Sequence, residues 1–420
     1  MNCWQDFRIK DLKANINSAF VDGPFGSNLK TEHFVEDGDV YVIDSGFITS
    51  GNFLIHREFR TITKEHFQTV KRSQCKENDI IIAKIGANFG MSAILPKLDK
   101  PSLVSGNTLK LTINRKKYFL KFIHYVFLYL KESYQIDILV KGSAQPALSM
   151  GLLNDLIFSV PNDLNEQTAI AQYLDTKTQT IDKKINLLTK KADYYKELRK
   201  SIINDAVCKG LDKNVKLKES GIDWIGKIPE HWEVKRVKAF AKTVKGRNLE
   251  FFDKPFEKAL PNLSLDYLRN DKVEFINYCY SSDKSQLVDE DDLIIVWDGA
   301  GVGEILKGKK GFISSTTAKF VFHKSMFSKF FFHLRDSIEY TLKQIPTGMG
   351  IPHLNPQVLN NFTCPIPPLK EQTAIANYLD EKTKKIDAIV SNIEKQIDTL
   401  KELRKTLIND VVTGKIKVIA

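Results

Sequence analysis

The clearest pattern along the chain is an apolar seam that occurs twice, in two long and otherwise polar segments. Successive seam positions are 4, 3, 4, 3, 3 and 4 residues apart in both segments. A repeat near 3.5 residues predicts helices that pair as a coiled coil. The predicted seam residues are Ile181, Ile185, Leu188, Ala192, Tyr195, Leu198 and Ile202 in the first segment and Ile386, Val390, Ile393, Ile397, Leu400, Leu403 and Leu407 in the second.

The two segments are copies of one sequence. Residues 166–205 and 371–410 align without a gap, and 23 of the 40 positions are identical, so the chain has the form A–B–A′–B′. A helix this long and polar cannot bury its seam alone. We expect the two copies to pair with each other as antiparallel helices. The alternatives are that each copy packs on its neighbouring A segment or on another subunit.

The A segments are more divergent but share landmarks. Residues 79–90 (DIIIAKIGANFG) and 292–303 (DLIIVWDGAGVG) are apolar runs that end in glycine turns, which predicts a buried strand and a tight loop. Residues 142–146 (GSAQP) and 348–352 (GMGIP) precede the two helices. The predicted fold is α/β (α+β), with two pseudo-repeated domains and two helical spacers. The predicted boundaries are 1–161 and 213–367 for the domains and 162–212 and 368–420 for the spacers.

Composition and charge narrow the class of protein. Apolar residues make up 42% and charged residues 27% of the chain, as in an ordinary globular protein. We see no apolar run long enough to cross a membrane and no signal peptide, so we expect a cytoplasmic protein. The net charge of +11 fits a partner that is a polyanion, such as double-stranded DNA. It equally fits a lysine-rich, solubilising surface, and charge alone does not decide between them.

No set of residues with the spacing of a catalytic or metal site stands out. The five cysteines and eight histidines are scattered, so we expect no metal site. Residues 297–303 (WDGAGVG) resemble an S-adenosylmethionine loop and run into a near P-loop, in which Lys310 replaces the Ser or Thr. Both motifs need a helix next, whereas a β-type run follows. We therefore expect a structural turn, no catalytic residues and no cofactor bound by this chain.

At this point the residues resemble a known family. The repeated EQTAIAxYLD…ID…KELRKxxIND block resembles the conserved regions of specificity subunits of Type I restriction-modification systems. Residues 224–232 (WIGKIPEHW) look like the opening of a target-recognition domain in those subunits, and residues 22–27 (DGPFGS) are also similar. The first half departs from the pattern, because it begins with residues 4–9 (WQDFRI) and lacks IPEHW.

The resemblance implies a specific function. Such subunits are not enzymes, and each of their target-recognition domains reads one half of a bipartite, asymmetric DNA site. The paired helices set the unread spacer and dock two methyltransferase subunits, which bind S-adenosylmethionine and methylate adenine. A restriction subunit that translocates and cuts DNA can join them. The alternatives are an unrecognised DNA-modifying enzyme and a coiled-coil scaffold that binds only proteins.

Candidate DNA contacts follow from residue type and position. Phosphates are bound by loop lysines and arginines, and bases are read by polar side chains on loops. A solvated surface role is at least as common for such residues. The candidates are Lys30, Lys84, Asn88, Lys141, Ser143 and Gln145 in the first domain and Lys245, Arg247, Asn248, Lys307, Lys309, Lys310 and Thr347 in the second.

Overall fold

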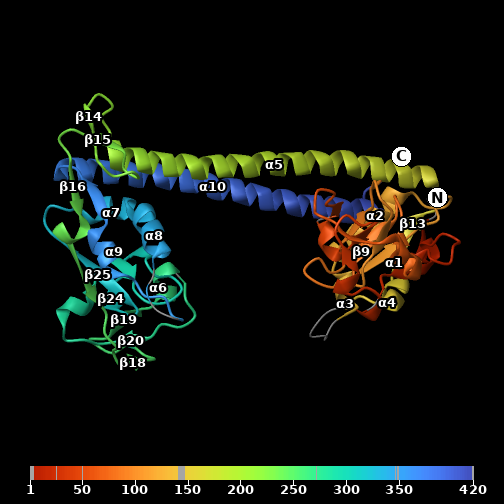
Figure 1. Cartoon of the computed structure of the whole chain (residues 1–420), viewed down its shortest axis with the longest axis horizontal. Coiled ribbons are helices and arrows are strands. Elements are labelled where there is room, and N and C mark those ends of the chain that lie inside the picture. The colour runs from red at the N-terminus through yellow and green to blue at the C-terminus, as the bar shows by residue number, and fades with distance from the viewer. Residues whose placement is uncertain are drawn as a thin grey trace. The chain divides into compact units, whose positions relative to one another are not determined.

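Both copies of the repeated sequence form long α-helices, as predicted. They lie in α5 (Leu164–Lys209) and α10 (Leu369–Val412), which are labelled in Figure 1. The chain divides into two compact units: unit 1 comprises residues 1–189 and 394–420, and unit 2 comprises residues 190–393. Each long helix therefore contributes to both units. The computed structural model describes residues 4–24, 26–49, 51–140, 147–270, 272–345, 347 and 350–418.

Unit 1 combines short strands with short helices. Its strands are β1 (Trp4–Arg8), β2 (Phe20–Asp22), β3 (Phe34–Val35), β4 (Val40–Ile43), β5 (Ile48–Thr49), β6 (Asn52–Phe53), β7 (Arg60–Ile62), β8 (Gln74–Cys75), β9 (Ile80–Ala83), β10 (Ser92–Ile94), β11 (Ser102–Val104), β12 (Thr108–Leu111) and β13 (Ile157–Pro161). Its shorter helices are α1 (Lys64–Thr69), α2 (Leu120–Glu132), α3 (Gln135–Ile138) and α4 (Met150–Asn154). One sheet has the order β10-β9-β12-β2 and another β3-β7-β4-β11-β8, in which β4 and β11 are parallel.

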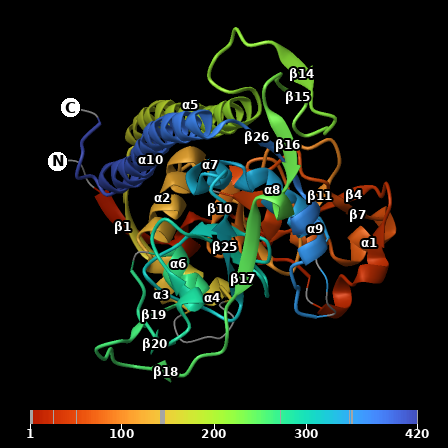
Figure 2. The ribbon, with the colours of Figure 1, turned by 90° about the vertical axis from the view of Figure 1, so that its left-hand side faces the viewer.

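Unit 2 is built in the same way. Its strands are β14 (Leu217–Glu219), β15 (Lys227–Pro229), β16 (Glu233–Arg236), β17 (Ala241–Lys245), β18 (Phe251–Phe252), β19 (Leu260–Leu263), β20 (Tyr278–Cys279), β21 (Leu287–Val288), β22 (Leu293–Val296), β23 (Ile305–Lys307), β24 (Gly311–Ile313), β25 (Thr317–Phe322) and β26 (Thr363–Ile366). Its shorter helices are α6 (Leu265–Arg269), α7 (Ser328–His333), α8 (Arg335–Gln344) and α9 (Pro356–Asn361). The strand pair β16 and β26 can be followed in Figure 2.

The two units repeat one topology. The sheet β17-β25-β22-β23 of unit 2 corresponds strand by strand to β2-β12-β9-β10 of unit 1. The parallel pair β19 and β24 corresponds to β4 and β11, and the pair β16 and β26 to β1 and β13. The predicted duplication of one mixed fold, carried on paired helices, is confirmed.

The ends of the long helices are anchored in the cores of the units. The start of α5 and the end of α10 both enter the core of unit 1, and the start of α10 and the end of α5 enter that of unit 2. A helix end whose apolar face is exposed to water is only marginally stable, so burial in the cores stabilises these helix ends. The anchoring residues are Ile170, Ala171, Leu174, Ile408, Val411 and Val412 in unit 1 and Ile375, Ala376, Leu379, Ile203, Ala206 and Val207 in unit 2.

The repeated Glu-Gln pair at the start of each long helix explains part of the sequence identity. Glu166 accepts a hydrogen bond from the indole N–H of Trp4 at 3.0 Å, and Glu371 accepts one from Trp232 at the same distance. Trp4 thus occupies the place that Trp232 holds in the IPEHW motif. The first half keeps the anchoring tryptophan of the motif although it lacks the residues that precede it.

The glutamine that follows is buried in both copies and bonds to three backbone groups. Gln167 accepts from the N–H of Phe119 at 2.8 Å, and Gln372 accepts from that of Phe327 at 2.8 Å. The amide nitrogen of each glutamine donates to two backbone carbonyls in its own unit. A buried amide with these partners satisfies backbone groups at the start of α2 and α7, which explains why glutamine occurs in both copies.

The long helices pair with each other and run antiparallel within each unit. In unit 1, Arg404 of α10 is paired with Asp182 of α5 at 3.0 Å. In unit 2, Arg199 of α5 is paired with Asp387 of α10 at 3.0 Å. Arg199 and Arg404 are the same position of the repeat, and so are the two aspartates. One sequence thus supplies both halves of a reciprocal ion pair.

All but one of the predicted seam residues are buried or half-buried, and the prediction is wrong at the one that is exposed. Leu403 is 53% exposed, and Arg404 faces the neighbouring helix instead. At 3.6 residues per turn the inward face drifts away from a strict 3.5-residue repeat, so it moves to Arg404 and Ile408. Ala192, Ile386, Val390 and Ile393 are buried. The remaining seam residues are half-buried: Ile181, Ile185, Leu188, Tyr195, Leu198, Ile202, Ile397, Leu400 and Leu407.

Candidate nucleic-acid interface

The glycine loops after β9 and β22 occupy equivalent places in the two units. The backbone N–H of Leu148 donates to the carbonyl of Lys84 at 3.0 Å, and that of Leu354 donates to the carbonyl of Trp297 at 2.7 Å. Lys84 and Trp297 are therefore equivalent positions, each directly after its strand. The loop of residues 297–303 is followed by strand β23, so the predicted β-type run after this loop is confirmed.

In unit 1 this position forms a buried ion pair. The ammonium group of Lys84 lies 3.3 Å from a carboxylate oxygen of Asp22, and both residues are buried. The sequence placed Lys84 among the loop lysines that are candidates for DNA contact, whereas the structure shows it buried. This ion pair links β2 to the loop after β9. Removing either partner would destabilise the fold, because the other charge would stay buried without a partner.

In unit 2 the equivalent place holds a more exposed cluster. Asp298 accepts from the ammonium group of Lys245 at 2.9 Å and contacts the imidazole Nδ1 of His353 at 2.6 Å. Thr347 donates its backbone N–H to the carbonyl of His353 at 2.9 Å. The structure therefore brings two of the predicted candidates, Lys245 and Thr347, to one place.

The two ion pairs have opposite polarity. Asp22 of β2 and Lys245 of β17 are equivalent, since each pairs with the second residue of its neighbouring strand, Leu109 or Ala318. The carboxylate therefore comes from β2 in unit 1 and from the loop after β22 in unit 2. Both units thus have an ion pair at this place in the fold, but the side chains that form the pair differ. The two units therefore present different surfaces here.

The cluster in unit 2 has a testable pH dependence. Burial alone would raise the pKa of Asp298, but hydrogen bonds from His353 and Lys245 outweigh it and leave the pKa below its ordinary value. A carboxyl with a depressed pKa stabilises the fold above its unfolded-state pKa and loses that contribution as pH falls through the folded value. We expect Asp298→Asn to lower Tm at pH 7, with the difference from wild type shrinking as pH falls below about 4. Thermal unfolding between pH 7 and pH 3 measures this, and a constant difference would contradict it.

The remaining candidates of unit 1 are partly described. Lys30 is exposed and lies 3.6 Å from a carboxylate oxygen of Glu32. Asn88 is half-buried and donates to the carbonyl of Ser45 at 3.2 Å. Three further candidates lie outside the described residues: Lys141, Ser143 and Gln145.

The remaining candidates of unit 2 differ in the contacts that their side chains make within the unit. Arg247 and Asn248 are exposed, and Arg247 lies 3.4 Å from Asp283. The ammonium group of Lys307 lies 5.0 Å from the ring centre of Phe332.

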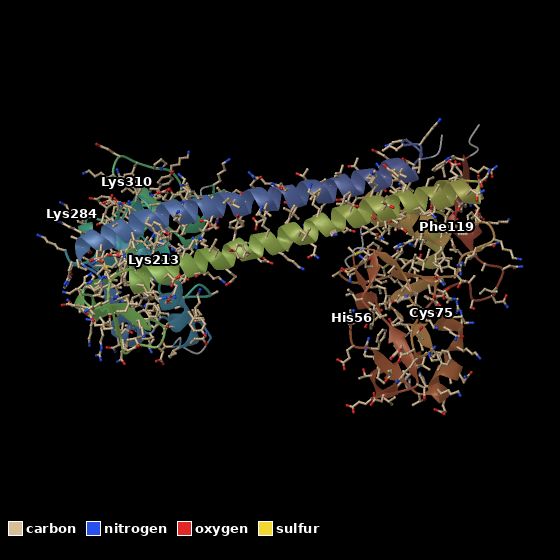
Figure 3. All side chains as sticks on the ribbon, turned by 90° about the horizontal axis from the view of Figure 1, so that it is seen from above. His56, Cys75, Phe119, Lys213, Lys284 and Lys310 are labelled. Carbon is tan, nitrogen blue, oxygen red and sulfur yellow. The ribbon has the colours of Figure 1, made fainter. Side chains whose placement is uncertain are left out.

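The neighbouring lysines complete the set. Lys309 donates to the carbonyls of Tyr267 and Asn270, both at 2.8 Å, so it holds the end of α6 in place. Lys310 is exposed, and Figure 3 shows it in unit 2. Contact of any candidate with DNA stays a prediction.

The sequence did not reveal a set of arginines beside the same glycine loops. In unit 1, Arg57 and Arg60 both donate to Asp44, at 2.7 and 3.1 Å. In unit 2, Arg269 donates to both carboxylate oxygens of Glu304, which follows the loop 299–303. The partners in each set are 13 to 35 residues apart, and no local pattern joins them.

Two further features, a metal site and a membrane-spanning helix, can be considered for the residues that the structure describes. Among the residues that the structure describes, no three His, Cys, Asp or Glu side chains come together as a metal site. In the same part of the chain, no helix combines the length and apolarity needed to span a membrane. His231 contacts Glu371 at 2.7 Å, at the same carboxylate that anchors Trp232.

Fold and site together define a class of protein: an internally duplicated one, with one mixed scaffold used twice, two different loop surfaces and two paired helices. The family model for the Type I restriction modification DNA specificity domain matches residues 1–190 and 229–399. The chain belongs to this family.

Known proteins agree with this assignment. The Type I restriction enzyme MjaVIII specificity subunit of Methanocaldococcus jannaschii is 34% identical over 189 residues, which cover 44% of this chain and 43% of that protein. The chain thus matches less than half the length of this relative. A second protein of that organism, provisionally named the type I restriction enzyme MjaX specificity subunit, is 26% identical over 81% of this chain and 79% of its own.

One solved structure shows the same fold. It is a chain from work on complex assembly and conformational transition of the type I R-M system, with a TM-score of 0.70 over 98% of both chains. Sequence identity to it is 14%, so this likeness concerns the fold.

Proposed function

We propose that this chain is the DNA sequence-recognition subunit of a Type I restriction-modification complex. Each unit reads one half of a bipartite, asymmetric site in double-stranded DNA, and the chain performs no catalysis itself. The observation that supports this most is the combination of a duplicated scaffold with loop surfaces that have diverged, down to the exchanged polarity of the Lys84–Asp22 and Lys245–Asp298 pairs. Two readers of two different sequences need one scaffold and two surfaces.

The partners and cofactor in this proposal lie outside the chain. The paired helices set the spacer between the half-sites and dock two methyltransferase subunits, and S-adenosylmethionine binds to those subunits. Restriction and translocase subunits can join the same complex. The repetition of the helix sequence supports two copies of one partner, since two similar surfaces can each bind a copy of the same protein. A complex of this kind acts on chromosomal DNA in the cytoplasm.

The test is a genome-wide map of methylated adenines in cells that carry the cognate methyltransferase, with and without this chain. We expect one split, asymmetric motif to be methylated only when the chain is present. The expected change is complete, because the methyltransferase alone has no reader for the site.

Two controls make the map decisive. The chain and the methyltransferase are both shown to be expressed and soluble, and a variant with the helix pair disrupted by Val390→Asp is mapped beside the wild type. An unchanged map on removal of the chain would contradict the proposal and favour a coiled-coil scaffold that binds only proteins.

A further inference from the structure

The loop between β4 and β7 of unit 1 packs into a core cluster of the unit through its apolar side chains, which include Phe47 and Ile48. It contains the β5–β6 hairpin, and the rings of three of its residues, Phe47, Phe53 and Phe59, stack on one another. The Phe47 ring centre lies 4.6 Å from that of Phe59, and Phe47 is buried in a core cluster. A loop packed in this way presents its outer side chains in a defined geometry.

Asp44, the first residue of this loop, organises two arginines. One carboxylate oxygen accepts from the backbone N–H of Gly46 at 2.8 Å and from Arg57 at 2.7 Å, and the other accepts from Arg60 at 3.1 Å. The Asp44 side chain is 11% exposed, whereas those of Arg57 and Arg60 are 41% and 56% exposed. A sheltered carboxylate thus orients two guanidinium groups that reach the surface.

Contacts with Phe47 and Gly46 also restrict the position of Arg57. Its guanidinium carbon lies 4.8 Å from the ring centre of Phe47. A side chain at Gly46 would overlap the Arg57 Nη1 atom, so glycine is what permits this close approach. A guanidinium has five N–H donors in a planar fork. Asp44 engages Nη1 of Arg57, and the fork geometry is set before any ligand arrives.

The surroundings of Arg57 suit the edges of bases. Leu54 and Ile55 on the same loop are 41% and 44% exposed, and the amide of Asn88 reaches the loop at Ser45. His56, the residue before Arg57, is exposed and is labelled in Figure 3. Arginine donates two hydrogen bonds to O6 and N7 of guanine, and apolar groups contact the thymine methyl group in the major groove.

We infer that Arg57, positioned by Asp44, reads a guanine in the half-site recognised by unit 1. This inference rests on the proposed function. Arg60 is less suited, because it borders a cavity that is also lined by the acidic residues Glu36, Asp37 and Glu58. A phosphate contact needs only positive charge, which the single carboxylate of Asp44 partly offsets, whereas base reading needs the oriented fork that Asp44 provides.

The test maps methylated adenines with the cognate methyltransferase and the Arg57→Lys, Arg57→Ala and Asp44→Asn chains. Lysine keeps the charge and loses the fork. For both Arg57 variants we expect one G·C position in one half-site to become degenerate, with discrimination falling about 10-fold to 100-fold, and the other half-site to stay unchanged. Asp44→Asn is expected to relax the same position less. Arg115→Ala is the control, since Arg115 is an exposed arginine that follows β12 at the end away from this loop.

The outcomes separate the possibilities. An unchanged motif in both Arg57 variants would overturn the inference. So would a uniform loss of methylation at all sites in Arg57→Ala that Arg57→Lys restores, because that pattern marks a phosphate contact. A wild-type chain that directs no split motif would instead contradict the proposed function. Thermal unfolding of each variant is measured alongside, and Arg57→Lys is expected to retain the wild-type Tm to within a few degrees.

Discussion

Replacement of Trp232 by alanine is expected to lower the free energy of unfolding of unit 2 by about 3 to 5 kcal/mol. Trp232 is fully buried in the core that also contains the end of α5, and its indole N–H donates to Glu371 at the start of α10. Gly210, just after α5, lies close enough that a Cβ there would meet the indole ring at 3.1 Å. The change therefore removes a large apolar volume and one hydrogen bond from the place where both long helices meet the unit.

Urea unfolding followed by hydrogen exchange in each unit measures this effect. Two units do not necessarily unfold as one, so a signal for each is needed. The matched control is Trp232→Phe, which keeps most of the ring volume and loses the N–H, with an expected cost of about 1 to 3 kcal/mol. A cost below about 1 kcal/mol for the alanine variant would show that the tryptophan is not an anchor.

Ile408→Ala is expected to destabilise unit 1 by about 2 to 5 kcal/mol, while Leu403→Ala changes its stability by no more than about 0.5 kcal/mol. Ile408 is fully buried in the core of unit 1, and Leu403, five residues earlier on α10, is 53% exposed. Both residues are aliphatic and lie on the same helix, so they differ mainly in burial. The free energy of unfolding falls in Ile408→Ala because truncation of a buried aliphatic side chain leaves a cavity in a packed core.

The same denaturation measurement, read in unit 1, compares the two variants. If Leu403→Ala were the more destabilising change, the strict 3.5-residue seam predicted from the spacing would be right and the drift toward Arg404 and Ile408 wrong. Arg404→Leu is a useful companion variant, because it replaces the ion pair with Asp182 by an apolar side chain on the inward face.

The candidate site was only partly predictable from the sequence. The glycine loops after β9 and β22 were placed correctly, because a run of β-branched residues ending in glycine is a local signal. The environment of their side chains was not predicted, because Lys84 is buried against Asp22, which is 62 residues away in sequence. Arg57 was missed because the carboxylate that orients it, Asp44, is brought to it by a loop path that no periodicity encodes.

The sequence by itself determined the duplication, the two long helices and the family. All three follow from the identities between residues 166–205 and 371–410 and from the spacing of apolar residues. Both features can be read directly from the linear sequence. Tertiary structure alone decided which face of α10 is buried near Leu403, that Trp4 takes the place of Trp232, and which arginines are oriented. Those outcomes depend on contacts between residues far apart in sequence, whose burial and hydrogen bonding are set only when the sheets and helices pack together.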